Sequence, residues 1–245
     1  MLFSLRVPLL LFVLAILSVG INSCKKEDGD SNDNNTSIVF NSALSYGSVI
    51  DQEGNSYRTI KIGNQTWMAE NLRTTIYNDG SSIARILVDS AAYLLPKGAY
   101  DNYNKTNNSD TIRTVGRHYN WYAVNSGKLA PAGWHVASKA EWDTLVANLG
   151  GLSVAGGKLK ETGFTHWSSP NTGATNESGF TALPAGRFYI VSKSFTHYTF
   201  GAWYWSSTSY SADEATYYGL NHTDNSVYKS HAQLFEGYSV RCVKD

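Results

Sequence analysis

The clearest alternation of hydrophobic and polar positions in the chain begins at Trp134. Trp134 and Val136 flank a polar residue, which predicts a short strand. Ser138 and Glu141 follow with the spacing of a capping box, in which each side chain accepts a backbone N–H of the other residue. Hydrophobic residues then recur on one helical face, namely Trp142, Leu145, Val146 and Leu149. We therefore predict one main helix from Ser138 to Leu149, ended by the two glycines that follow.

A second clear pattern, upstream of this helix, predicts a β-hairpin. Residues 57–62 alternate between two faces, Gly63-Asn64 supplies a turn, and residues 65–68 return. Patterning is weaker from there to the helix. Residues 100–110 are polar and rich in turn formers, which predicts a long surface loop, whereas residues 119–124 fit a helical turn or a buried strand equally well.

Glycines become frequent after the main helix, and short strands replace helical patterning. Residues 155–161 predict a partial helix, and the segments that follow are irregular up to Arg187. Strand-like runs then recur at intervals of about 8–12 residues, as in an antiparallel meander. They cover residues 202–208, 216–220, 226–229 and 238–243. The pattern as a whole predicts an α+β domain of antiparallel strands, one main helix and much irregular loop.

The pattern of the first residues predicts a targeting signal that is not part of the folded domain. Arg6 precedes an apolar run, Val7 to Val19, which is shorter than the roughly 18–20 residues of a membrane span and has signal-peptide proportions. The run ends in Ile21-Asn22-Ser23-Cys24, which resembles a bacterial lipoprotein signal with Cys24 as the lipidated residue. The alternative is ordinary secretion with Cys24 a leftover thiol.

Composition separates a polar segment from the folded part. Residues 24–37 are rich in Asp, Asn and Ser and predict a disordered tether. Within it, Lys25 to Asp30 resembles the signal for export to the outer face in Bacteroidetes-type lipoproteins, although a solvated charge run would look the same. Residues 38–245 are long enough for one core. The net charge of +0 gives no reason to expect a nucleic-acid partner.

Several blocks in the right order resemble the Fibrobacter succinogenes major paralogous domain family. They are Gly63 to Leu72, Tyr119 to Val124, Lys128 to Val136, Asn176 to Phe180, Trp205 to Thr208 and Tyr238 to Asp245. The resemblance implies a C-type-lectin-like fold, related to formylglycine-generating sulfatase-modifying enzymes, in surface lipoproteins. We therefore expect an outer-membrane lipoprotein exposed at the cell surface.

Residue spacing gives little support to catalytic or metal-binding chemistry. His135 has no other His or Cys within four residues, so a core or hydrogen-bonded role is favoured over metal ligation. Cys242 is expected to be a buried, inert thiol. The nearest candidates for a lectin-type calcium site are Asn171, Asn176 and Glu177, although turn formation is the ordinary use of such residues. We predict no catalytic residue, no metal and no cofactor.

An aromatic cluster in the C-terminal half is the best candidate for a ligand-binding surface. Successive strand side chains point to opposite faces, so these rings cannot all face one core, although inner rings in the core and outer rings under loops would also satisfy the pattern. The candidate residues are Trp203, Tyr204, Trp205, Tyr210, Tyr217 and Tyr218.

The sequence predicts a non-catalytic binding or adhesion domain for a glycan or protein ligand, held on a membrane by its lipid anchor. The first alternative is an enzyme of the sulfatase-modifying type. The related family implies paired cysteines for that chemistry, and lipidation of Cys24 would leave only Cys242. The second alternative is a structural component of a surface layer.

Overall fold

The computed structural model describes Met1, residues 37–85 and residues 95–245. The predicted signal peptide, the lipidated Cys24 and most of the tether lie outside the described residues. Of the two compact units in the chain, the one formed by Asp33–Asp245 contains all the described helices and strands. In the part of the chain that the structure describes, no helix is both long and apolar enough to cross a membrane.

The largest sheet has five strands in the order β1-β2-β3-β13-β7. The predicted hairpin is confirmed, because β2 and β3 pair antiparallel with Ile60 opposite Trp67. The strand predicted before the main helix is confirmed as β7, which pairs with β13 at the edge of the sheet. The bounds are β1 (Gly47–Ile50), β2 (Ser56–Ile62), β3 (Gln65–Met68), β7 (Trp134–Val136) and β13 (Cys242–Lys244).

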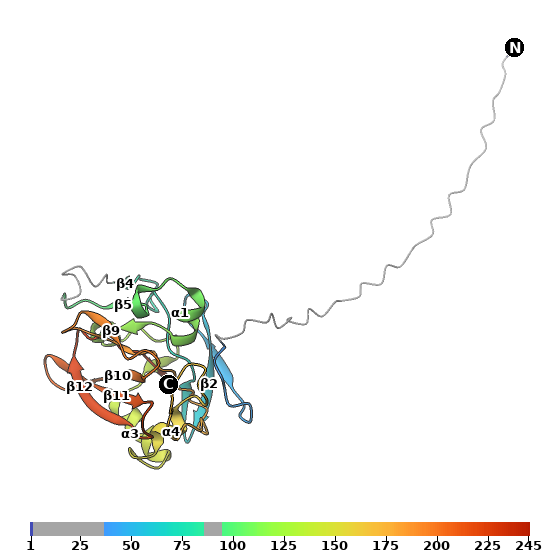
Figure 1. Cartoon of the computed structure of the whole chain (residues 1–245). Helices are drawn as coiled ribbons and strands as arrows, with labels where there is room; N and C mark the ends of the chain where they lie inside the picture. Colours follow the sequence, from blue (N-terminus) through green and yellow to red (C-terminus); the bar gives the residue numbers. More distant parts are fainter. Residues whose placement is uncertain (2–36, 86–94) are drawn as a thin grey trace. The chain divides into compact units, whose positions relative to one another are not determined.

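A second sheet contains the C-terminal meander, which has three strands and not the predicted four. Its order is β10-β11-β12, with bounds Gly201–Ser209, Glu214–Asn221 and Tyr228–Gln233. In Figure 1 these strands lie together, across the domain from β2. The last predicted strand, 238–243, does not continue this meander. Its first half makes isolated bridges at Tyr238 and Ser239, and its end becomes β13 of the five-stranded sheet.

Two small sheets complete the β structure of the described residues. One has the order β4-β5-β6, with a parallel pair between β4 and β5, and the other pairs β8 with β9. The bounds are β4 (Ala84–Arg85), β5 (Ala99–Asp101), β6 (His118–Tyr119), β8 (Arg187–Tyr189) and β9 (Ser194–Thr196). An isolated bridge between Gly186 and Ala202 places β8 beside β10.

The main helix, α3 (Lys139–Asn148), is confirmed with its capping box. Ser138 Oγ accepts the Glu141 N–H at 3.3 Å, and the Glu141 carboxylate accepts the Ser138 N–H at 2.8 Å. Residues 121–124, whose pattern was ambiguous, form a helical turn. The shorter helices are α1 (Ser109–Val115), α2 (Trp121–Val124), α4 (Ala155–Leu159) and the 3-10 turn η2 (Tyr103–Lys105).

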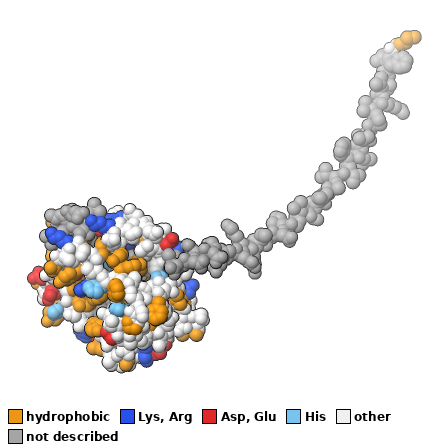
Figure 2. All heavy atoms as spheres, in the orientation of Figure 1, with side chains coloured by type: hydrophobic (Ala, Val, Ile, Leu, Met, Phe, Trp, Pro, Cys, Tyr) orange, Lys and Arg blue, Asp and Glu red, His pale blue; other side chains and the backbone are white. Residues whose placement is uncertain are grey.

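Helix α1 was not expected from the sequence, because polar turn formers dominate the segment before it. Asn108 supplies the missing local signal, since its side chain accepts the Thr111 N–H at 2.8 Å as an N-cap. The described part of the chain consists mainly of antiparallel sheets with four α-helices, which is consistent with the predicted α+β class. Figure 2 shows acidic, basic and hydrophobic side chains interspersed over the face in view.

The core is built around aromatic rings that α3 brings onto the second sheet. Trp142 stacks on Tyr218 with ring centroids 5.0 Å apart and meets Trp67 edge-on at the same distance. Phe180 packs against both tryptophans. The apolar face predicted for the helix is therefore the face that is buried.

A fully buried guanidinium holds the end of the chain onto this core. Arg241 donates hydrogen bonds to the Asn71 side chain and to the backbone carbonyls of Met68, Phe180 and Thr181, at 2.7–3.0 Å. Bonds to the charged group offset the cost of burying it. Period-two alternation puts Tyr238, Val240 and Cys242 on one face of this segment and Arg241 on the other. Both faces are in fact buried, and Arg241 fills the second one.

Candidate functional site

Three of the six aromatic residues predicted to bind ligand are core residues, so this part of the prediction is wrong. Tyr204, Trp205 and Tyr218 expose 1% or less of their surface. The reason is that both faces of β10 and β11 are covered over part of their length. Tyr204 and Tyr218 pack against Trp142 of α3, and on the other face Trp205 stacks on Tyr238 at 4.3 Å.

A fourth candidate, Tyr210, is exposed but separate from the others. It follows β10, has 63% of its surface exposed, and its ring centroid is 3.9 Å from that of His231. Tyr210 does not line either of the pockets described below. The structure therefore does not join it to the remaining two aromatic candidates.

The remaining two, Trp203 and Tyr217, line a pocket on the second sheet that we call the aromatic groove. Strand register explains its shape, because Trp203 pairs with Gly219 and Gly219 pairs with Tyr228. Gly219 therefore forms a floor between two aromatic walls, and Tyr217 lies one row along. The groove has a volume of about 390 Å³ and is lined by Trp203, Tyr217, Gly219, Leu220, Asn221, Tyr228, Lys229 and Ser230.

Glycines allow the Trp203 indole to lie close to the strands. A Cβ atom on Gly201 would be 2.5 Å from the ring, and one on Gly219 would be 3.3 Å from the indole Nε1. Side chains at these two positions would displace the ring. The groove therefore depends on two glycines and two aromatic residues that come from three different strands, a combination that only the register reveals.

Polar side chains at the edge of the groove are held by neighbouring carboxylates. Lys229 donates to Asp143 at 2.7 and 2.9 Å, and the Tyr228 hydroxyl donates to Asp224. Burial raises the carboxyl pKa of Asp143, but hydrogen bonds from Lys229 and others outweigh this and hold the pKa near 2. These contacts orient the edge before any ligand arrives.

A buried lysine supports the edge of the groove at Asn221. Lys160 Nζ donates to the backbone carbonyls of Thr172, Asn221 and Asp224 at 2.9, 2.9 and 2.7 Å. Burial lowers the ammonium pKa to about 8, and the negative charge of Asp224 opposes this shift. The sequence did not single out Lys160, because lysines are rarely fully buried and nothing local marks this one.

Arg187 and Glu236 lie beside the groove, and the sequence reasoning named neither as a binding residue. The antiparallel bridge between Phe188 and Gly237 puts Arg187 next to Tyr238 and Tyr189 next to Glu236. Glu236 is 3% exposed, and its Oε2 has no hydrogen-bond partner among the described residues. Burial raises the Glu236 pKa to about 7, against opposing effects of the Ile190 N–H and Arg187.

The three residues considered for a calcium site are engaged in other interactions. Asn171 donates to the carbonyls of Glu161 and Gly163, the Asn176 side chain bonds to Thr181, and Glu177 forms an ion pair with Lys158 at 2.9 Å. No group of three or more His, Cys, Asp or Glu side chains within the described ranges could hold a metal ion.

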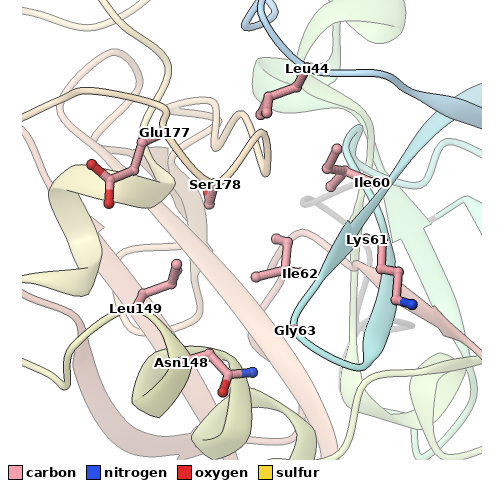
Figure 3. Close-up of a pocket in the computed structure, with 9 residues that line it drawn as sticks. All are labelled: Leu44, Ile60, Lys61, Ile62, Gly63, Asn148, Leu149, Glu177 and Ser178. Carbon is pink, nitrogen blue, oxygen red and sulfur yellow. The ribbon is translucent and has the colours of Figure 1, made fainter.

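Glu177 also borders a second pocket, of about 400 Å³, at the C-terminal end of α3. Figure 3 shows Ile60 and Ile62 of β2 on one side of it, Leu44 above, and residues of α3 and the Glu177–Ser178 loop opposite. Its full lining is Leu44, Ile60, Lys61, Ile62, Gly63, Asn148, Leu149, Glu177 and Ser178. Facing aromatic walls, which define the aromatic groove, are missing from this lining.

The remaining predicted residues have structural positions. His135 is hydrogen-bonded, as expected, with Nδ1 2.6 Å from Asp245 and Nε2 2.6 Å from Glu141. Burial alone would lower the His135 pKa, but the two carboxylates raise it. Cys242 is fully buried, as expected, and burial raises its thiol pKa, which disfavours the reactive thiolate. Cys24, the predicted lipidation site, lies outside the described residues.

We compared the chain with protein families, curated proteins and solved structures. Neither the curated proteins nor the solved structures contain a match. A family model described as the Fibrobacter succinogenes major domain matches residues 60–244, which include both pockets apart from Leu44 and every described candidate residue. The chain therefore belongs to the Fibrobacter succinogenes major domain family.

Proposed function

We propose that this chain is a surface lipoprotein whose folded domain binds a glycan in the aromatic groove. The observation that carries the proposal is the row Trp203–Gly219–Tyr228, in which a glycine stands between two aromatic residues and lets the Trp203 indole lie close over the strand. Flat apolar ring faces with polar groups at their edges suit a sugar, which has an apolar C–H face and a hydroxyl rim. Asn221 and Ser230 supply uncharged polar groups at that rim.

Size and exposure are consistent with ligand binding. A volume of about 390 Å³ lies within the roughly 300–1,000 Å³ typical of small-molecule sites. Tyr228 is a half-exposed aromatic residue on a sheet face. Covering its apolar ring with a ligand would remove that surface from water, which favours binding. Loops on one side of the groove are held by Lys160, so that the site is largely formed in advance.

The proposal includes the finer fold assignment and the location of the protein. We assign the domain to the C-type-lectin-like group on two grounds. The family it belongs to resembles that group, and the domain combines short antiparallel sheets with a main helix and long connections. The lipoprotein-like signal ending at Cys24 supports an outer-membrane anchor, and the acidic segment after it supports display on the cell surface.

An enzyme of the sulfatase-modifying type has less support. Thiol chemistry requires an accessible thiolate, whereas Cys242 is fully buried in the core. Glu236, the carboxyl group with the most raised pKa, is itself buried and has no partner carboxylate among the ion pairs and hydrogen bonds described above. Among the described residues, no contact or surface specifically favours the role of a surface-layer component.

The test is a glycan array probed with the full-length chain in detergent, followed by titration of the best glycan. Tyr228→Ala removes one wall and should lower affinity about tenfold or more. Ser230→Trp fills the groove from an exposed position and should abolish binding. The matched control is Tyr210→Ala, because this tyrosine is also exposed but lies outside the groove.

Two results would contradict the proposal. If Tyr228→Ala and Ser230→Trp bind the glycan like the parent while melting at the same temperature, the groove is not the site. If the array yields no glycan and a protein array yields a partner that Ser230→Trp loses, the ligand class is protein and the glycan assignment is wrong.

A further inference from the structure

Arg187 lies on the rim of the aromatic groove with its guanidinium over two rings. The guanidinium carbon is 5.1 Å from the centre of the Trp203 ring and 5.0 Å from that of Tyr189. The bridge between Gly186 and Ala202 fixes this position by placing β8 alongside β10. Arg187 is not itself among the residues that line the groove, and it adjoins the groove through its contact with the Trp203 ring.

Arg187 has no carboxylate partner among the described residues. None of the ion pairs in the described ranges includes it, and its Nε is buried without an acceptor. Lys229 lies opposite Tyr218 on β12, so its ammonium is on the α3 face of the sheet, where it is paired with Asp143. Arg187 is therefore the cation beside the groove that forms no ion pair within the described ranges, while its charge still acts on Glu236 and on the Tyr238 hydroxyl.

Glu236, an acidic residue coupled electrostatically to Arg187, forms no ion pair with it. Glu236 lies next to Tyr189 across the bridge at Gly237. Burial keeps a fraction of its carboxyl groups protonated near neutral pH, since its pKa is raised to about 7. Burial and then the charge of Glu236 raise the pKa of the Tyr238 hydroxyl, and its interaction with Arg187 opposes this shift.

We propose that Arg187 binds an anionic group, a carboxylate or a sulfate, on the glycan that occupies the aromatic groove. This inference rests on the proposed function and names its substrate class, an acidic glycan. A guanidinium stacked on aromatic rings keeps the edge of its plane open, and that edge presents the paired N–H groups that match a carboxylate or sulfate. The rings fix the plane, so that little side-chain freedom is lost on binding.

The test uses three oligosaccharides with one backbone: neutral, carrying a uronic acid, and carrying a sulfate. Each is titrated against the full-length chain, against Arg187→Gln and against Lys229→Gln. The parent should bind one or both acidic forms more tightly than the neutral form. Arg187→Gln should lower affinity for the acidic form about 10- to 100-fold and leave the neutral form unchanged. Lys229→Gln, whose charge is already paired, should have a smaller effect.

The outcomes separate this inference from the proposed function. If the parent binds the neutral form as tightly as both acidic forms, or if Arg187→Gln weakens all three equally, Arg187 does not read an anion, although the groove still binds sugar. If none of the three binds, both proposals fail. If Arg187→Gln does not fold, the parent decides the matter: affinity for the acidic form must fall with added salt while affinity for the neutral form stays constant.

Discussion

Replacing Trp142 with alanine tests whether α3 is held by its buried aromatic face. The indole is 1% exposed and has four aromatic neighbours within 6 Å, of which Tyr218 is stacked on it and Trp67 meets it edge-on. Alanine would leave a cavity between the helix and both sheets, because these neighbours belong to rigid strands or to the packed loop at Phe180.

The expected cost follows from the area and the contacts that are lost. An indole buries roughly 200 Å² of mostly apolar surface, which corresponds to about 5 kcal/mol at about 25 cal/mol per Å². Against this, Trp142 Nε1 is buried without an acceptor among the described residues, and removing that N–H offsets about 1–2 kcal/mol. Trp142→Ala should therefore lower the free energy of unfolding by about 3–4 kcal/mol, which lies within the range usual for Trp→Ala in a core.

Urea unfolding followed by circular dichroism measures this change. Ser138→Ala, which removes the N-cap of the same helix, should cost only about 1 kcal/mol. Trp142→Phe keeps a ring and removes the unpaired N–H, so it should fall between the parent and alanine. If Trp142→Ala costs no more than Ser138→Ala, the helix is not held by this face and the reasoning is refuted.

Three further changes give distinct results. The raised pKa of His135 stabilises the fold below about pH 6.5, and this contribution is lost as pH rises through the folded pKa, so pH-dependent melts of His135→Gln should match the parent at high pH only. Lys160→Met leaves three carbonyls unpaired and should cost at least about 2 kcal/mol in urea unfolding, a loss that unaltered stability would contradict. Cys24→Ser should release the protein from membranes, which cell fractionation would detect, and mature protein still in the membrane fraction would exclude this anchor.

Local sequence determined the elements whose signals lie within a few residues. The β2–β3 hairpin followed from alternation around Gly63-Asn64, and α3 followed from its capping box and apolar face. The buried state of Cys242 followed from the apolar residues beside it. In each case the interactions that decide the conformation join residues close in the chain, so that pattern and propensity were sufficient.

Only the tertiary structure decided which aromatic rings meet solvent. Period-two alternation separates Trp203 from Tyr204 but does not say that α3 covers one face and Tyr238 part of the other. Likewise β13 joins the five-stranded sheet and not the meander next to it in sequence, because Arg241 binds carbonyls from segments 60 to 173 residues away.

The candidate site depends on such long-range placement throughout. The groove exists because strand register puts Gly219 between Trp203 and Tyr228, and a shift of one residue would fill it with a side chain. Lys160 and Arg187 carry no local mark of their roles. Their function comes from the carbonyls and rings that distant segments bring to them, and the free energy of packing those segments together is a property of the whole fold.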